Sequence, residues 1–373
     1  MIDEVQASAI LSVDLAALVG NWRQIAAMVA PAAAAAVVKA DAYGLGAIPV
    51  VRALVDAGCR HFFVAQLSEA TAILPALPHD ASAYVLNGLM PGVESACAAT
   101  GAVPVLNSLD QVVRWNDLAR SERRVLPAIL QVDSGMARMG LPPQELAFLV
   151  QERDRIDHIR LLFIASHLAC ADNPKNPANA AQIANFEAAC LAFPSIPRTL
   201  ANSGGSLAIP VSRNDLVRPG LALYGINPVP ADETPLQPVV SLQARIIQLR
   251  NVPAGAGVGY DLQFVAQRET RIATIGVGYA DGWPYSLANC GTAYVGGVRV
   301  PFAGRVSMDS ITLDVTDVPE RHLFPGALVE LIGPNQSLAQ VAADAGTIPY
   351  EILTRLGRRF ARRHVLQAPS TQA

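Results

Sequence analysis

The chain has 373 residues, of which 51% are hydrophobic and 16% are charged, and its formal net charge at pH 7 is −3. A chain so rich in apolar residues and so poor in charge can bury a large core and is not intrinsically disordered. The nearly neutral balance gives no electrostatic reason to expect a nucleic acid or an anionic membrane as a partner.

The cysteines and the N-terminus favour a soluble protein of the reducing cytoplasm. No two of the five cysteines are close enough in sequence to form a CxxC motif, so we expect free thiols and no metal site. The acidic N-terminus lacks the basic start of a secretory signal. The alanine-rich run at 26–38 contains Pro31 and is too short for a membrane span of ~20 residues.

The first two thirds of the chain alternate helical and strand-like segments. From Leu15 to Val29, apolar residues recur at helical spacing, which predicts a helix with one buried face. Short apolar runs then predict strands at 36–39, 62–65, 83–86, 103–106, 128–132, 161–166, 199–201 and 216–217. Continuous apolar runs are typical of parallel strands buried on both faces. Eight of them with helices between predict a (β/α)8 barrel over 1–235, although an open doubly wound sheet would give the same alternation.

The alternation of helical and strand-like segments ends near residue 235, after a proline-rich stretch. Strand-like segments with Gly and Pro turns follow at 239–249, 271–277, 293–300 and 310–315, and a helical segment at 338–345. We therefore predict an α/β protein whose second domain, 236–373, is mainly antiparallel β. The first residues of the chain are expected to pack on this second domain.

Lys39 ends the first strong apolar strand. Burying an ammonium is costly unless the group is paired or neutral, and barrel enzymes place their working groups at this end of their strands. A lysine with a lowered pKa, or one bound covalently as a Schiff base, would resolve that cost. An ordinary lysine in the loop after a strand is an equal alternative on position alone.

The surrounding segment, Val37–Gly46 (VVKADAYGLG), closely resembles the cofactor-lysine signature of the alanine racemases. These are pyridoxal-phosphate enzymes built from a barrel and a β domain. Similar segments run from Ser12–Asp14 to Thr347–Glu351, so the resemblance covers nearly the whole chain. It implies interconversion of L- and D-alanine through a pyridoxal-phosphate aldimine at Lys39, by a two-base mechanism. The product would supply cell-wall peptidoglycan or alanine catabolism.

The resemblance also implies the residues that hold the cofactor. The phosphate ligands would be Tyr43, Ser203, Gly220, the backbone amide of Leu221, and Tyr350. The predicted strands support part of this assignment. Turns containing Ser203 and Gly220 follow the seventh and eighth predicted strands, where barrels commonly bind phosphate.

Two further residues would lie near the cofactor ring. Arg218 resembles the arginine that faces the pyridine nitrogen, and a guanidinium there donates a hydrogen bond without giving up its proton. Weaker electron withdrawal favours racemisation over transamination. His167, which ends another predicted strand, would belong to the polar network behind the cofactor.

Tyr260 is implied as the second base. Racemisation removes a proton from one face of the α-carbon and returns one to the other, and two groups on opposite faces achieve this directly. The family places a lysine on one face and a tyrosine, here Tyr260, on the other, in a head-to-tail homodimer with shared active sites. From the sequence, a tyrosine supplied by the same chain stays an equal alternative.

The remaining implied residues bind the substrate or line its entrance. Arg138 would contact the substrate carboxylate and the phenolic oxygen of the cofactor, since its planar fork suits pairs of oxygens. The backbone amide of Met308 would bind the same carboxylate. The supporting and entrance residues would be Gln131, Asp172, Tyr279, Arg305, Asp309 and Tyr350.

The chain departs from the family pattern at four positions. Gln131 stands where many members have a carbamylated lysine, so we expect a neutral anchor for the Arg138 guanidinium and no dependence on carbon dioxide. Thr199 stands where a histidine often lies behind the catalytic tyrosine, which predicts a high pH optimum. Asp261 replaces a usual glycine and Tyr285 an arginine at the entrance. The last two leave the substrate range open.

Three alternatives compete with this interpretation, and entrance changes such as Tyr285 leave room for the first of them. One is a racemase of the same architecture acting on serine or on a broad set of amino acids. A second is a pyridoxal-phosphate carrier without turnover, although such proteins resemble the barrel alone. A third, a decarboxylase of related plan, fits the order of the motifs poorly.

Overall fold

The computed structural model describes residues 4–230 and 233–366. They form two compact units. The barrel unit comprises Ala17–Ala42 and Gly46–Gln237, and the β unit comprises the described residues up to Ala16, Tyr43–Leu45 and those from Pro238 onward.

The α-helices are α1 (Leu15–Val29), α2 (Lys39–Tyr43), α3 (Ala47–Asp56), α4 (Leu67–Ile73), α5 (Glu94–Thr100), α6 (Leu109–Ser121), α7 (Pro143–Gln151), α8 (Pro177–Cys190), α9 (Ser203–Ala208), α10 (Leu338–Asp344) and α11 (Pro349–Arg355). The strands of the barrel unit are β2 (Ala33–Ala34), β3 (Ala36–Val37), β4 (His61–Val64), β5 (Ser82–Val85), β6 (Val103–Leu106), β7 (Leu126–Gln131), β8 (Ile159–Ala165), β9 (Arg198–Thr199) and β10 (Leu216–Val217). The strands of the β unit are β1 (Ala9–Asp14), β11 (Val240–Val252), β12 (Gly257–Val258), β13 (Phe264–Val265), β14 (Thr270–Ile275), β15 (Thr292–Val295), β16 (Val298–Pro301), β17 (Ile311–Asp314), β18 (Leu328–Ile332) and β19 (Ala361–Val365).

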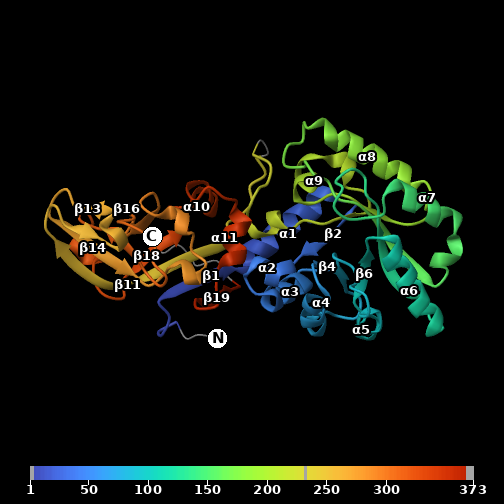
Figure 1. The fold of residues 1–373 in the computed structure, drawn as a ribbon, viewed down its shortest axis with the longest axis horizontal. Helices are drawn as coiled ribbons and strands as arrows, with labels where there is room; N and C mark the ends of the chain where they lie inside the picture. Colours follow the sequence, from blue (N-terminus) through green and yellow to red (C-terminus); the bar gives the residue numbers. More distant parts are fainter. Residues whose placement is uncertain (1–3, 231–232, 367–373) are drawn as a thin grey trace. The chain divides into compact units, whose positions relative to one another are not determined.

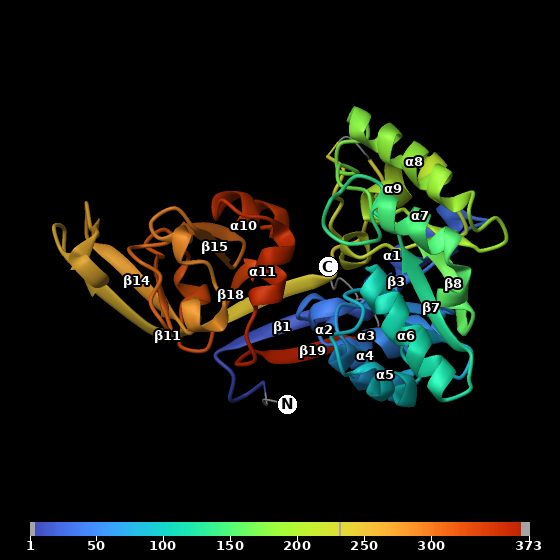
Figure 2. The ribbon, with the colours of Figure 1, turned by 45° about the vertical axis from the view of Figure 1, so that its right-hand side comes forward.

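The strands of the barrel unit close into a parallel ring. Strands β3 to β9 pair in chain order, and β10 pairs with β2, which directly precedes β3. The ring is completed between β9 and β10, where the amide of Asp215 donates to the Arg198 carbonyl (3.1 Å) and that of Arg218 to the Ala201 carbonyl (2.9 Å). Helices α3 to α6 lie along the outer side of the strands (Figure 2). The predicted α/β fold with a (β/α)8 barrel is confirmed.

Burial explains why the barrel strands read as continuous apolar runs. All four residues of β6 and the last three of both β4 and β5 are buried, because helices cover the strands outside and other side chains fill the barrel. The predicted strand positions agree with the structure to within two residues. The expectation that Lys39 itself ends a strand is wrong, since β3 ends at Val37 and Lys39 begins α2.

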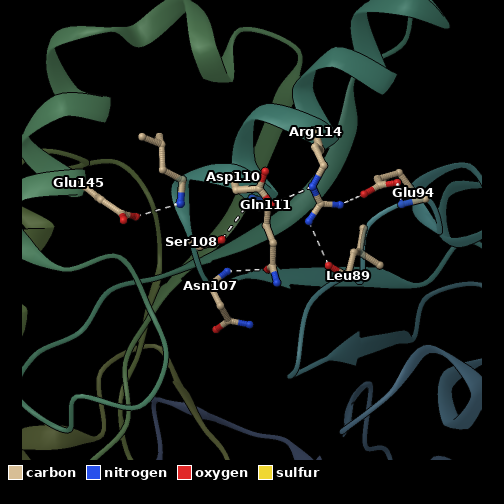
Figure 3. A network of polar contacts seen from close by, with 10 residues as sticks. Leu89, Glu94, Asn107, Ser108, Asp110, Gln111, Arg114 and Glu145 are labelled. Carbon is tan, nitrogen blue, oxygen red and sulfur yellow. Dashed lines mark hydrogen bonds and ion pairs between the residues drawn. The ribbon is translucent and has the colours of Figure 1, made fainter.

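A polar network centred on Arg114 ties α6 to its neighbours in the barrel unit (Figure 3). The Arg114 guanidinium forms an ion pair with Glu94 of α5, another with Asp110 (2.9 Å), and a hydrogen bond to the Leu89 carbonyl (3.2 Å). Ser108 caps α6 by accepting from the Gln111 amide (3.3 Å). The network fixes the loop after β5 to the two helices that follow it.

The β unit is built on one large sheet. Its strands run in the order β16-β15-β18-β11-β1-β19, and β14 pairs with both β11 and β17. All these pairs are antiparallel except β1 with β19. The long β11 pairs with β1 and β18 over its first half and with β14 over its second (Figure 1). The mainly antiparallel β domain is confirmed.

The β unit also differs in detail from the predicted strands. The segment 293–300 is not one strand but a hairpin, β15 and β16, joined by Gly296 and Gly297 with φ of 56° and 82°. Strands β12, β13, β18 and β19 were not predicted. In the described residues, no helix is both long and apolar enough to cross a membrane.

Candidate active site

Lys39 stands at the start of a strained turn in the barrel unit. The four residues after it, Ala40 to Tyr43, all have left-handed backbone angles, with φ between 52° and 57°. Each costs roughly 1–2 kcal/mol for a residue with a side chain. The turn is held by the Asp41 carboxylate, which accepts from the Ala47 amide (2.7 Å), and by Glu69, which accepts from the Ala40 amide (2.7 Å). Strain maintained in this way is typical of functional sites.

The surroundings of Lys39 favour its neutral form. Burial, and secondarily the charge of Arg138, lower the pKa of the Lys39 amine, and Glu69 acts in the opposite direction. A lower pKa increases the fraction of unprotonated, nucleophilic amine near neutral pH. The side chain is thus suited to bind a carbonyl compound covalently.

Arg218 is buried, with 5% of its surface exposed, just after β10. Its Nη1 donates to the Thr199 hydroxyl (2.6 Å), and its Nη2 donates to the carbonyls of Ser166 (2.6 Å) and Leu200 (3.3 Å). No carboxylate within the described ranges bonds to it. Burial lowers the pKa of Arg218 to about 10.

His167 lies beside this guanidinium, with its Nδ1 3.5 Å from Nη2 of Arg218. Burial, and then the charges of Arg218, Arg138 and Lys39, lower the pKa of His167 to about 3, so the imidazole is neutral. Thr199 stands where the family often has a histidine behind the catalytic tyrosine. Its hydroxyl contacts Arg218.

Ser203 joins the loops after β9 and β10. Its buried hydroxyl accepts from the amides of Gly220 (2.9 Å) and Ala222 (3.3 Å), which flank Leu221. The Asn202 side chain accepts from the Gly205 amide (3.1 Å) and caps α9. Three of the predicted phosphate ligands, Ser203, Gly220 and Leu221, are therefore neighbours.

The loops after β7 and β8 carry the other predicted barrel residues. Arg138 is exposed in a loop that Asp133 shapes by accepting from three backbone amides, at Gly135, Met136 and Ala137. Gln131 ends β7, and no hydrogen bond joins it to Arg138, although both residues are described. Asp172 is exposed after β8 and accepts from the Asn173 amide (3.1 Å).

Gln182 of α8, buried against the loop after β8, was missed by the sequence analysis. Its amide donates to the His167 carbonyl (3.0 Å) and accepts from the Ala169 amide (2.8 Å), as a neighbouring strand would. A polar residue at an apolar position of the helix pattern was the only signal available. The clamp fixes the backbone that carries His167.

Tyr260 lies in the β unit, in the short helical turn Tyr260–Leu262 between β12 and β13, and is 67% exposed. The Asp261 carboxylate beside it forms an ion pair with Arg305 (2.6 Å). Met308 is 53% exposed, and its carbonyl accepts from the Ala280 amide (3.0 Å). Loops 259–262, 278–282 and 305–309 thus carry a group of exposed site residues.

Arg359, also missed from the sequence, braces two of these loops. Its guanidinium bonds to Asp281 (2.6 Å), whose carboxylate accepts from the Gly278 amide (2.9 Å), and to Asp309 (2.7 Å). These carboxylates raise the pKa of Arg359. The ion pair with Asp309 thus fixes the loop that carries Met308.

Besides Tyr260, four tyrosines named in the sequence analysis lie in the β unit. Tyr279 packs edge-on against Tyr285 with ring centres 6.2 Å apart. Burial, and then the neighbouring Tyr350, raise the pKa of Tyr43 to about 12, so its hydroxyl keeps its proton. As a proton donor, Tyr43 is suited to hydrogen-bond an anion.

Two family models match the chain. Residues 13–228 match the N-terminal domain of alanine racemase, and residues 239–364 match its C-terminal domain.

Alanine racemases from other organisms are similar to this chain over almost its full length. The catabolic alanine racemase of Agrobacterium fabrum is 51% identical over 359 residues, which cover 96% of this chain and 92% of that protein. The alanine racemase of Brucella canis is 52% identical over 375 residues, covering 97% and 95%. The crystal structure of alanine racemase from Bartonella henselae, with covalently bound pyridoxal phosphate, has a TM-score of 0.93 at 42% identity and covers 96% of this chain and 100% of its own.

Proposed function

The chain belongs to the alanine racemase family, and we propose that Lys39 and Tyr260 are the two groups that move the α-hydrogen of alanine between the faces of the substrate. Membership makes the protein an amino-acid racemase that depends on pyridoxal phosphate. One observation supports the assignment of Lys39 most directly: a part-buried amine, its pKa lowered by burial and by the charge of Arg138, begins the strained turn just after strand β3.

The barrel residues fit a phosphorylated, aldehyde-bearing cofactor. Lys39 supplies the amine for the aldehyde, and the Ser203 hydroxyl with the backbone at Gly220 and Leu221 would hold the phosphate. Beside Ser203, a Cβ on Gly204 would lie 2.5 Å from the Ala171 carbonyl, so glycine is required for the backbone to pass there. Arg138 and Arg218 provide positive charge that suits an anion.

The Arg218 guanidinium would face the ring nitrogen of the cofactor. When bound, pyridoxal phosphate acidifies the α-hydrogen by withdrawing the electron pair left on the α-carbon. Arg218 keeps its own proton, since even the lowered pKa of about 10 lies above neutral pH. With neutral His167 and Thr199 as neighbours, it can donate a hydrogen bond but cannot protonate the nitrogen.

The proton then moves between this chain's own groups and the α-carbon. On one face the neutral Lys39 amine would take the proton and its ammonium form would return one. On the other face Tyr260 would take the proton as a phenolate and return one as a hydroxyl. Arg138 and the Met308 amide would hold the substrate carboxylate, which fixes the α-hydrogen in line with one base or the other. Tyr43 and Tyr350 would contact the phosphate.

We propose a homodimer in which Tyr260 and Met308 serve the barrel of a second copy. The support is the exposure of Tyr260, Tyr279, Tyr285 and Met308 on one unit, since large apolar groups gathered on a surface mark interaction sites. Gln131 would anchor Arg138 without a charge, and Asp172, Tyr279, Arg305 and Asp309 would line the substrate entrance.

We also propose that the protein acts in the cytoplasm. There it would supply D-alanine for peptidoglycan or serve alanine catabolism.

The test is racemisation of L-alanine, followed by chiral chromatography with L-serine in parallel, for the wild type and Tyr260→Phe. We expect alanine turnover that falls by a factor of about 10²–10⁴ in the variant, with the absorbance of bound cofactor retained. Faster turnover of serine would change the substrate but keep the mechanism. Cofactor binding without turnover of any amino acid would contradict the assignment and favour a carrier.

A further inference from the structure

We propose that Glu69 is a positioning residue for Lys39. Its carboxylate fixes the peptide that follows the lysine and supplies the negative charge that helps the Lys39 amine to hold a proton during turnover. The second half of the proposal rests on the base role proposed for Lys39.

The contacts of Glu69 exceed what its own helix needs. Its Oε2 accepts from the amides of Ala65 (2.7 Å) and Gln66 (3.1 Å), the usual role of a glutamate at the third position of a helix such as α4. Its Oε1 accepts from the Ala40 amide (2.7 Å), which belongs to α2. The bond to Ala40 contributes nothing to capping α4, so another requirement must explain it.

That requirement is the geometry of the turn after Lys39. Ala40 is the first of four consecutive left-handed residues, and such a turn forms only when its surroundings hold it. The Ala40 amide belongs to the same peptide plane as the Lys39 carbonyl, so a bond at Ala40 fixes the orientation in which the Lys39 side chain leaves the backbone. Figures 1 and 2 both show α2, α3 and α4 next to one another.

Charge gives Glu69 a second influence on Lys39. A base that removes a proton becomes an ammonium, and near Lys39 both burial and Arg138 oppose that charge. Glu69 is the carboxylate that acts against them. Without it, Lys39 would accept the proton from the α-carbon less readily.

The matched control is Glu145 of α7 (Figure 3). It also stands at the third position of a helix of the barrel unit, and it accepts from a backbone amide of another element, that of Leu109 at the start of α6 (3.0 Å). Glu69→Gln and Glu145→Gln each remove one charge and replace one carboxylate oxygen with an amide nitrogen that cannot accept. Glu69 accepts through both oxygens and so must lose a contact, whereas Glu145 can keep its one bond through the remaining oxygen. Only the first change lies beside Lys39.

The experiment measures cofactor affinity by absorbance titration, melting temperature, and the α-deuterium isotope effect on kcat for L- and D-alanine in the holoenzyme. For Glu69→Gln we expect cofactor affinity to fall about tenfold, because a hydrogen bond to a charged group is lost. We also expect the isotope effect to rise for one enantiomer only, the one from which Lys39 removes the proton. Glu145→Gln should change neither.

Unchanged cofactor affinity together with isotope effects that change equally for both enantiomers would overturn the proposal, since a structural role alone predicts that pattern. If Glu69→Gln does not fold, Glu69→Asp keeps the charge but lacks the reach to Ala40. It should lose cofactor affinity without the one-sided isotope effect, and wild-type values for both would equally contradict the proposal. If the wild type racemises no amino acid, the proposed function fails, and the cofactor titration still decides the positioning role.

Discussion

Replacing Thr199 with valine tests the surroundings of Arg218 at nearly constant side-chain volume. The Thr199 hydroxyl accepts from Nη1 of Arg218 (2.6 Å) and donates to the Leu216 carbonyl (2.7 Å), and all three residues are buried. Losing a hydrogen bond to a charged group costs roughly 1.5–3 kcal/mol, and a buried carbonyl left unsatisfied adds roughly 1–3 kcal/mol. We expect a total of about 3 kcal/mol.

For a unit of this size, about 3 kcal/mol lowers the melting temperature by roughly 6–12 °C. Differential scanning calorimetry measures it, with Thr71→Val as the control, because the Thr71 hydroxyl donates only to the Leu67 carbonyl on the exposed surface of α4. That control should stay within about 0.5 kcal/mol of the wild type. Equal melting temperatures for the two variants would refute the reasoning.

Three further predictions address pH, an ion pair and carbon dioxide. Burial lowers the pKa of His167 to about 3, whereas an unfolded histidine titrates near 6.5, so the contribution of His167 to stability is lost as pH falls from about 6.5 towards 3, by up to about 1.4 kcal/mol per pH unit. In urea unfolding at pH 7.5, 6 and 5, the free energy of unfolding should therefore decline less steeply for His167→Gln than for the wild type. Parallel declines for the two proteins would contradict this. Arg114→Ala should lose about 3 kcal/mol in urea unfolding, because it leaves the mostly buried Glu94 unpaired, whereas Arg124→Ala, which breaks an exposed pair (3.0 Å), should lose less than about 1 kcal/mol. With Gln131 in place of a carbamylated lysine, alanine racemisation should not respond to added bicarbonate at fixed pH, and a rise in rate would disprove neutral anchoring.

Sequence reasoning located most of the barrel because its signal is local. A strand covered on both faces must be apolar throughout, so the runs at 103–106 and 216–217 coincide with β6 and β10. In the β unit, strands pair with distant segments and carry a weaker pattern. The segment 293–300 therefore read as one strand, and the two glycines that turn it into a hairpin were overlooked.

For the site, the sequence by itself determined which residue types stand at the strand ends, and its motifs resembled one family across nearly the whole chain. Lys39, His167 and Arg218 could be selected because each polar residue follows an apolar run. Only the tertiary structure decided their environment. Thr199 bonds to Arg218, Gln182 clamps the loop of His167, and Glu69 reaches the peptide after Lys39. These contacts join residues 15–29 positions apart, and their strength depends on burial and distances of about 3 Å, which exist only once the barrel has closed.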